Sequence, residues 1–382
     1  MAVWAGVLGI VLLAVVNFDI TFTVLSSGQP SFFSGLYLGA ARRLLLVIAH
    51  YSKRRRRRVL TNGMWPLVVV ILIASWNILL WASYSLIFFL TPDSVARTAT
   101  GMPGNILDTI YVAGYGLFSL GVGDIAPTPG AYQLLLVCSC LNGVIVASMS
   151  VNYSLTMVST FRTTAAVSFR IAALGDTPDQ FIDTFWDGHV WDHVAFQTAL
   201  AFLLHQLGPL LPSARTNPLI LNFFVVKRQA SIMVMIAVLC ESLLLLQHGV
   251  RGPPLVPRAQ YIMLRRSISH FFDYLARHGM FHYYSDDALD KQTVPAPLPL
   301  SLLERVGMPV TSMEAYEEAI CATDIRQMRR SLLTLVDAAG WAWEDAVPLP
   351  EGVERRVQVH GPSLPVPPIP YPFSSSMGLQ SR

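Results

Sequence analysis

The sequence predicts an all-α membrane protein, and three observations lead to this fold class. The 382 residues are 53% hydrophobic and only 13% charged, whereas a soluble domain is about 25% charged. Several uncharged segments are long enough to cross a bilayer, and much of the positive charge is concentrated in one short run. After Arg162 the composition becomes mixed and keeps a helical apolar period, which predicts an α-helical domain outside the membrane.

The N-terminal region, residues 1–63, is expected to hold a membrane helix, an interfacial helix and a basic run. Residues 2–25 are apolar with Asp19 as their one charge, and they lack the basic start of a cleaved signal peptide. Residues 32–50 are also apolar but contain two adjacent arginines. Burying these arginines inside the bilayer is costly, so a helix along the inner surface is favoured.

The basic run follows this segment and consists of Lys53, Arg54, Arg55, Arg56, Arg57 and Arg58. Such a run can bind nucleic acid, but its place between apolar segments favours the cytoplasmic membrane surface, with anionic lipids as candidate contacts. We therefore expect a lipid membrane partner and no nucleic acid.

Two uncharged segments, residues 64–90 and 131–160, predict an outer and an inner membrane helix. The first is long enough to cross about 30 Å of hydrocarbon with some tilt. The second would be about 45 Å long and should continue into the cytoplasm. Because the basic run stays inside, the first helix runs outward and the second returns. This topology predicts a multi-pass protein of the inner (plasma) membrane with a cytoplasmic C-terminal domain.

A short helix and a glycine motif lie between these two segments. Residues 105–118 predict a half-helix capped by Asn105, which is too short to cross the bilayer. It leads into the sequence SLGVGD, in which Gly121 and Gly123 permit backbone dihedrals that other residues avoid. A Gly-x-Gly-Asp sequence alone is most often a surface turn. Irregular backbone at membrane depth, however, lines a watery path or is buried in protein, so the flanking helices favour a carbonyl-lined path.

This order of helix, half-helix, S-L-G-V-G-D and second helix resembles the pore domain of the potassium channel family, whose filter has the form Thr-Val-Gly-Tyr-Gly-Asp. The resemblance covers roughly residues 64–160. It implies a potassium-channel-like pore domain in a homotetramer, K⁺ as the permeant ion and a gating hinge at Gly143, for which close helix packing is the alternative. It also implies an ion-binding filter, formed by Ser119, Leu120, Gly121, Val122, Gly123 and Asp124.

The sequence leaves several functions open. The main expectation is passive conduction of potassium, and a weakly selective cation channel is a variant because Val122 replaces the family's aromatic residue. A membrane-anchored helical sensor or scaffold with a non-conducting pore-like segment is the alternative from another class. Ser148, Ser150 and Asn152 either line a water-filled cavity or bond between helices.

The region after the pore domain is expected to form a cytoplasmic helical domain over residues 161–345, followed by a proline-rich, extended or disordered tail over 346–382. Its most apolar segment, residues 231–247, is short and contains Glu241. A buried helix of that domain is therefore favoured over a further membrane span, although contact with the membrane is left open.

We expect no enzyme activity, because no nucleophile lies in a pattern with a base and no catalytic residue can be assigned. His270, Asp273, His278 and His282 share a helical spacing, but the set lacks an assignable third zinc ligand. The sequence therefore predicts no cofactor, and no metal beyond the permeant K⁺.

Overall fold

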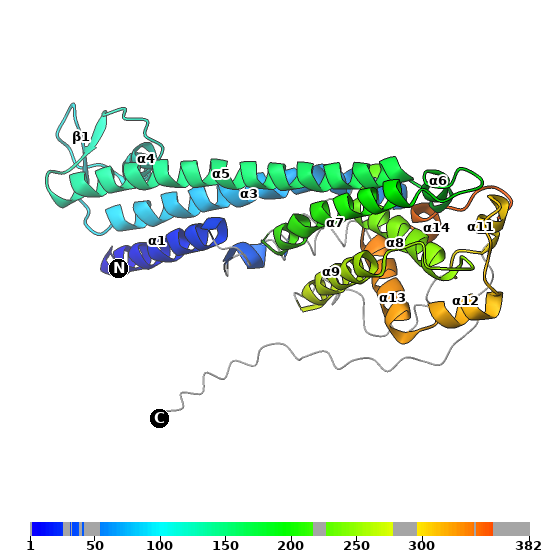
Figure 1. Cartoon of the computed structure of the whole chain (residues 1–382). Helices are drawn as coiled ribbons and strands as arrows, with labels where there is room; N and C mark the ends of the chain where they lie inside the picture. Colours follow the sequence, from blue (N-terminus) through cyan, green and yellow to red (C-terminus); the bar gives the residue numbers. More distant parts are fainter. Residues whose placement is uncertain are drawn as a thin grey trace, which may run out of the picture.

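The computed structural model describes residues 2–25, 31, 33–37, 40–41, 54–216, 227–277, 296–339 and 341–353. The molecule is elongated and mostly helical (Figure 1). One long helix, α5 (Ala131–Leu174), runs along most of it and links a membrane-type half at one end to a helical C-terminal half at the other.

The membrane-type half is built from α1 (Ala2–Leu25), α3 (Arg54–Phe88) and the first part of α5. All three helices are long and apolar enough to cross a bilayer. Helices α1 and α3 are antiparallel, since Gly6 approaches Leu90 whereas Asp19 bonds to Trp76. Their shared core contains Leu72, Trp76, Leu80 and Phe88 of α3 together with Val16 and Ile20 of α1.

A short helix and a two-stranded antiparallel sheet close the far end of this half. Strand β1 (Val95–Arg97) pairs antiparallel with β2 (Ile125–Pro127), and Val95 lies opposite Pro127. Helix α4 (Ile106–Leu117) lies between the two strands in the chain and buries residues from Val112 to Leu117. The pairing of β1 with β2 thus brings the segment before α4 next to the segment after it.

The C-terminal half packs around one apolar helix, α8 (Ile232–His248). Every residue from Ile232 to Leu246 is buried, Glu241 included. The prediction of a buried helix over residues 231–247 is therefore confirmed. The surrounding elements are the end of α5, α6 (Pro178–Asp183), α7 (His193–Thr216), η2 (Arg228–Ala230), α9 (Arg258–Arg277), α11 (Ser301–Arg305), α12 (Met313–Ile320), α13 (Thr323–Ala338) and α14 (Trp343–Ala346).

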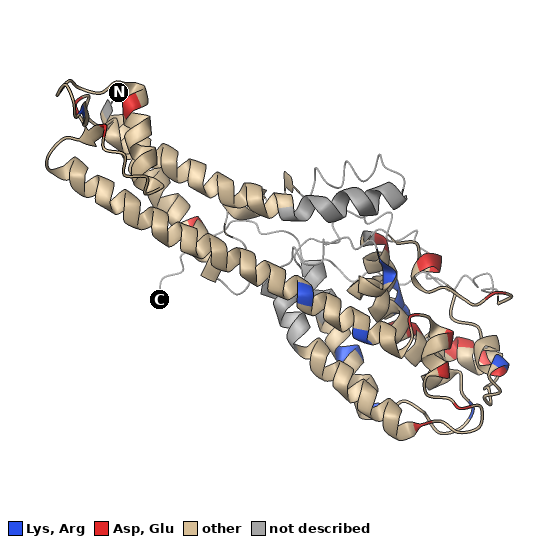
Figure 2. Ribbon diagram, turned by 90° about the horizontal axis from the view of Figure 1, so that it is seen from above, with Lys and Arg blue, Asp and Glu red and all other residues tan. Residues whose placement is uncertain are grey.

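Charge divides the two halves as the composition predicts. Figure 2 shows most of the lysine, arginine, aspartate and glutamate residues of the described part in the C-terminal half, while the long helices are uncharged over most of their length. An uncharged helix surface suits hydrocarbon, because a bilayer core offers no water to solvate a charge.

Helix bounds differ from the predicted ones mainly at two ends. Helix α3 begins at Arg54 rather than at residue 64, because arginine is a good helix former and can extend the helix backward. Helix α5 continues past residue 160 to Leu174, where its last turns join the C-terminal core through Val167 and Ile171. The boundary expected at 161 therefore lies inside a continuous helix, which is about 66 Å long.

Some predictions fall outside the described residues. Lys53 and most of the expected interfacial helix lie there, although residues 33–37 are helical. The tail predicted over 346–382 lies there from residue 354 onward, and of the short helix α14 only the last residue, Ala346, falls within the predicted tail.

Candidate functional site

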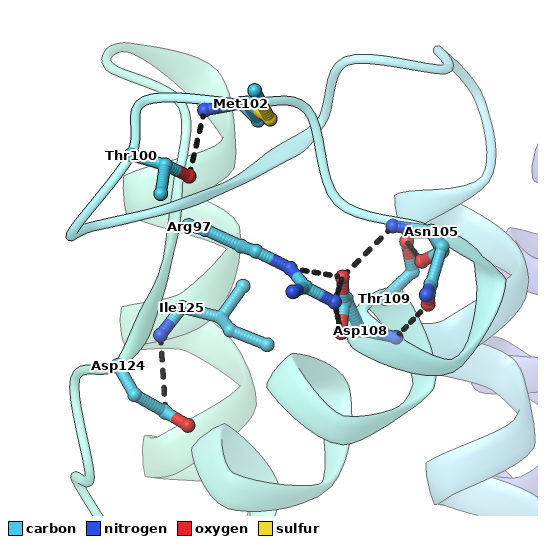
Figure 3. Close-up of polar contacts among 8 residues, drawn as sticks. All are labelled: Arg97, Thr100, Met102, Asn105, Asp108, Thr109, Asp124 and Ile125. Carbon is cyan, nitrogen blue, oxygen red and sulfur yellow. Dashed lines mark hydrogen bonds and ion pairs between the residues drawn. The ribbon is translucent and has the colours of Figure 1, made fainter.

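Helix α4 is capped as its sequence predicts. The Asn105 Oδ1 atom accepts from the Asp108 backbone N–H at 2.9 Å, and an Asp108 carboxylate oxygen accepts from the Asn105 N–H at 3.0 Å. Arg97 of β1 adds two charged bonds to the same carboxylate, from Nε at 3.1 Å and Nη2 at 3.4 Å (Figure 3). The Asn105 N–H first, and Arg97 second, lower the pKa of Asp108. The start of α4 is thereby fixed to β1.

The C-terminal part of α4 is seated against α3 and α5 through close contacts. The Trp81 indole donates to the Ile110 carbonyl at 2.8 Å, and a Cβ added at Gly114 would come within 2.8 Å of that indole nitrogen. A Cβ at Gly143 would overlap the Leu117 carbonyl oxygen, so a larger residue would force α5 and α4 apart. The structure thus gives Gly143 a packing role, while a hinge movement at Gly143 stays a prediction.

The segment after α4 has an alternating backbone. Ser119, Gly121 and Gly123 have φ values of 55°, 62° and 80°, and the residues between them do not have positive φ. Ser119 is the one non-glycine residue with a positive φ in the described part of the chain, which is an uncommon conformation. The sign of φ therefore alternates along residues 119–123, a pattern that can turn successive carbonyl groups toward one side.

Hydrogen bonds hold both ends of this segment. At its start, the Ser119 and Leu120 N–H groups donate back to the Gly116 and Tyr115 carbonyls at 3.1 and 2.9 Å. At its end, the Thr98 hydroxyl donates to the Gly123 carbonyl at 2.8 Å, and the Thr98 N–H donates to the Asp124 carbonyl at 3.0 Å.

The side chains of the segment are exposed in the single chain. Residues 118–124 are all exposed, and the apolar Leu120 and Val122 are 65% and 56% exposed. Together with Phe118, which is 47% exposed, they place three apolar side chains at the surface within five residues. The segment predicted as a filter is therefore one continuous, exposed strip, which the structure brings next to β1 and α5.

Sequence reasoning missed several residues that hold this strip. Thr98 is one, and the buried Tyr115 is another, since its hydroxyl donates to the Ile125 carbonyl at 2.6 Å. The Cys140 sulfur on α5 lies 3.3 Å from the Ser119 hydroxyl oxygen. Tyr115 had a local signal, a polar hydroxyl on an apolar half-helix, but nothing in the sequence sets Thr98 apart from its neighbours.

Helix α5 carries a polar stripe on an exposed face. Its members are exposed and recur at intervals of three or four residues: Ser148, Asn152, Thr156, Ser159 and Thr163. Of the three residues predicted either to line a cavity or to bond between helices, Ser148 and Asn152 thus share this face. Ser150 does not, because it is buried with a hydroxyl that has no hydrogen-bond partner in the described structure.

The remaining candidates give no second site in the described part of the chain. Within the described residues no group of three or more His, Cys, Asp or Glu side chains could hold a metal ion. His278 and His282 lie outside those residues. The backbone of Arg54–Arg58 forms the first turns of α3. Phe185 and Trp191 form an aromatic cluster with Phe196, so they serve packing.

Comparison with known proteins adds one relative. The chain is 24% identical over 278 residues to the uncharacterized membrane protein YdjJ of Bacillus subtilis, an alignment that covers 73% of this chain and 78% of that protein. No protein-family model and no solved structure matches. Together with the three apolar helices, this similarity establishes a mostly helical membrane protein.

Proposed function

We propose that the chain is one subunit of a homotetrameric channel that passively conducts potassium or other monovalent cations. The observation that carries this proposal is the alternating backbone of residues 119–123. Carbonyl oxygens turned to one side can replace the hydration shell of a cation. One chain supplies one wall only, so several copies must surround the path.

The position of this segment also suits a cation. It begins at the C-terminal end of α4, where the helix dipole is partly negative. Asp124 follows at the outer mouth and is exposed. Both features favour a cation over an anion at this point.

The exposed surface of α5 supports the same proposal. Only 17% of the most apolar 18-residue stretch of α5 is buried in the single chain, compared with 39% for α3. Four copies would cover the apolar parts of this surface and turn the polar stripe toward a water-filled path. Arg162, near the inner end of that stripe, would mark the cytoplasmic exit.

Membrane placement completes the proposal. The basic start of α3, together with Lys53, would lie on the cytoplasmic side against anionic lipids. The β1–β2 sheet and α4 would then face outward, and the C-terminal half would lie in the cytoplasm beneath the inner (plasma) membrane. Conduction of this kind uses no covalent chemistry and no cofactor.

Ion flux into liposomes tests the proposal, with two glycine variants that differ in position alone. Gly121 and Gly101 have nearly the same φ, 62° and 66°, and nothing lies within 4 Å of a Cβ added at either. Gly121→Ala is expected to abolish K⁺ flux, because an alanine disfavours the left-handed backbone of the filter. Gly101→Ala should conduct. Absence of flux from the wild-type tetramer, or equal flux from both variants, would contradict the proposal.

Selectivity is measured in the same liposomes. Val122 offers no aromatic ring to pack behind the filter, and its side chain is 56% exposed. A K⁺ flux well above Na⁺ flux would support a potassium channel. Equal permeability would leave the weakly selective cation channel.

A sensor or scaffold is the second candidate, and the independent core of the C-terminal half favours it. This core centres on α8 and contains residues from α6 to α14. In this function the membrane helices act as an anchor and the pore-like segment does not conduct. A purified monomer or dimer that passes no ions would support it.

A further inference from the structure

We infer that Thr98 is a positioning residue that sets the selectivity of the proposed filter by holding its outer end; this role rests on the proposed function. Two consecutive carbonyls, those of Gly123 and Asp124, accept from the hydroxyl and the N–H of this one residue. Thr98 lies 25 residues earlier in the chain than Gly123, in the loop that follows β1.

The middle of the filter depends on its two ends. Among the described residues, the backbone groups of Gly121 and Val122 make no hydrogen bond. The inner end is tied to α4 through the Ser119 and Leu120 amides. The outer end is tied through Thr98, and one step later through Tyr115 to Ile125. Loss of the Thr98 hydroxyl would therefore free the Gly123 carbonyl.

Contacts of the neighbouring residue hold the backbone that carries Thr98. Its neighbour Arg97 lies opposite Ile125 in the β1–β2 pair. The Arg97 side chain makes two hydrogen bonds to the Asp108 carboxylate (Figure 3). The Arg97 N–H also donates to the Met102 carbonyl at 2.9 Å. Through these contacts, β1 connects the start of α4 to the exit of the filter.

Through Thr98, these contacts control the discrimination between K⁺ and Na⁺ in the proposed filter. The Gly123 carbonyl is the outermost of the alternating series, and a hydroxyl that donates to it fixes its direction. A freed carbonyl can rotate and adapt to ions of different size. Discrimination between K⁺ and Na⁺ should therefore weaken before conduction is lost.

The test compares Thr98→Val with Thr98→Ser and Thr100→Val in the full-length tetramer in liposomes. Valine matches threonine in shape and keeps the backbone bond to Asp124, but it cannot donate to Gly123. Serine restores the donor. Thr100 lies in the same loop and bonds to the Met102 N–H, away from the filter (Figure 3).

Thr98→Val should lower the ratio of K⁺ to Na⁺ permeability by up to roughly tenfold, because the free energy of the one lost hydrogen bond is the upper bound on its different effect on the two ions. Thr98→Ser and Thr100→Val should keep the wild-type ratio. A wild-type ratio in Thr98→Val would overturn the inference while leaving the channel intact. An equal fall in Thr100→Val would also overturn it, because the effect would then belong to the whole loop.

Hydrogen–deuterium exchange of residues 119–124 separates this inference from the channel proposal. If the wild type passes no ions, the proposed function fails. The exchange comparison then still tests whether the Thr98 hydroxyl holds residues 119–124 in place. Faster exchange in Thr98→Val than in wild type and Thr98→Ser would support the positioning role. Equal exchange would overturn it. If Thr98→Val does not fold, Thr98→Ala against Thr98→Ser gives the same comparison.

Discussion

Among the described residues, each half of the chain holds one carboxylate that is at most 3% exposed, and the two halves satisfy it in different ways. In α1, Asp19 is 2% exposed and accepts from four neutral donors: the backbone N–H groups of Phe33 and Ser34, the Ser34 hydroxyl and the Trp76 indole. In α8, Glu241 is 3% exposed and pairs with Arg329, which is itself 2% exposed.

The difference follows from the surroundings of each half. A second buried charge would have to be inserted into hydrocarbon in the membrane-type half, where arginine is costly. The helical residues 33–37 instead offer first-turn amides to Asp19, which is how a helix start binds an anion. The C-terminal half can bring a cation from α13 and satisfy it further, because the Ala296 carbonyl accepts from Arg329 at 3.2 Å.

Removal of the Arg329 side chain should have the largest effect on stability. In Arg329→Met, Glu241 keeps its burial and loses bonds of 2.6 and 3.1 Å. An unpaired buried charge costs about 3–5 kcal/mol, so the C-terminal half should unfold at least several degrees lower in detergent. Thermal unfolding followed by circular dichroism measures the shift, with the exposed Arg266→Met as the matched control.

The double variant Glu241→Leu/Arg329→Met sharpens this result. With both charges gone, no buried charge is left without a partner, and apolar replacement of a buried pair is often neutral or stabilising. Most of the lost stability should therefore return. A double variant as unstable as Arg329→Met would show that shape, rather than the unpaired charge, causes the loss.

Local patterns of the sequence predict much of the fold and part of the site. The membrane helices follow from uncharged runs, and the half-helix with its Asn105 cap follows from residues within one turn. Contacts between distant residues have no such signal. Arg329 lies 88 residues from Glu241, and the Thr98 hydroxyl reaches Gly123 only because β1 and β2 pair. Helix α5 extends past the predicted end at 160, as its expected continuation into the cytoplasm requires, but its end at Leu174 has no signal because polar residues after 160 can be part of a helix that packs on protein.

Loss of the Asp19 side chain should have a smaller effect than loss of Arg329. In Asp19→Ala, the four donors lose their acceptor, but none of them carries a charge. The expected cost is about 1–3 kcal/mol, the range for buried donors left without a partner. Asn17→Ala is the control on the same helix, because its side chain bonds to the Leu13 carbonyl of its own helix. A loss equal to that of Arg329→Met would remove the contrast between the two halves.

The smallest expected effect is a pH dependence confined to the C-terminal half. Burial lowers the pKa of His248, although Asp324 opposes this shift, and the His248 Nε2 atom has no hydrogen-bond partner in the described structure. Because the folded pKa lies below the unfolded value of about 6.5, the unfolded state binds the proton first. Stability of this half should therefore fall as the pH drops through that value. The fall should be shallower in His248→Gln than in the control His270→Gln, whose side chain is exposed. Unfolding experiments from about pH 8 to about pH 5.5 measure the slope of stability against pH. Equal slopes in the two variants would contradict this assignment.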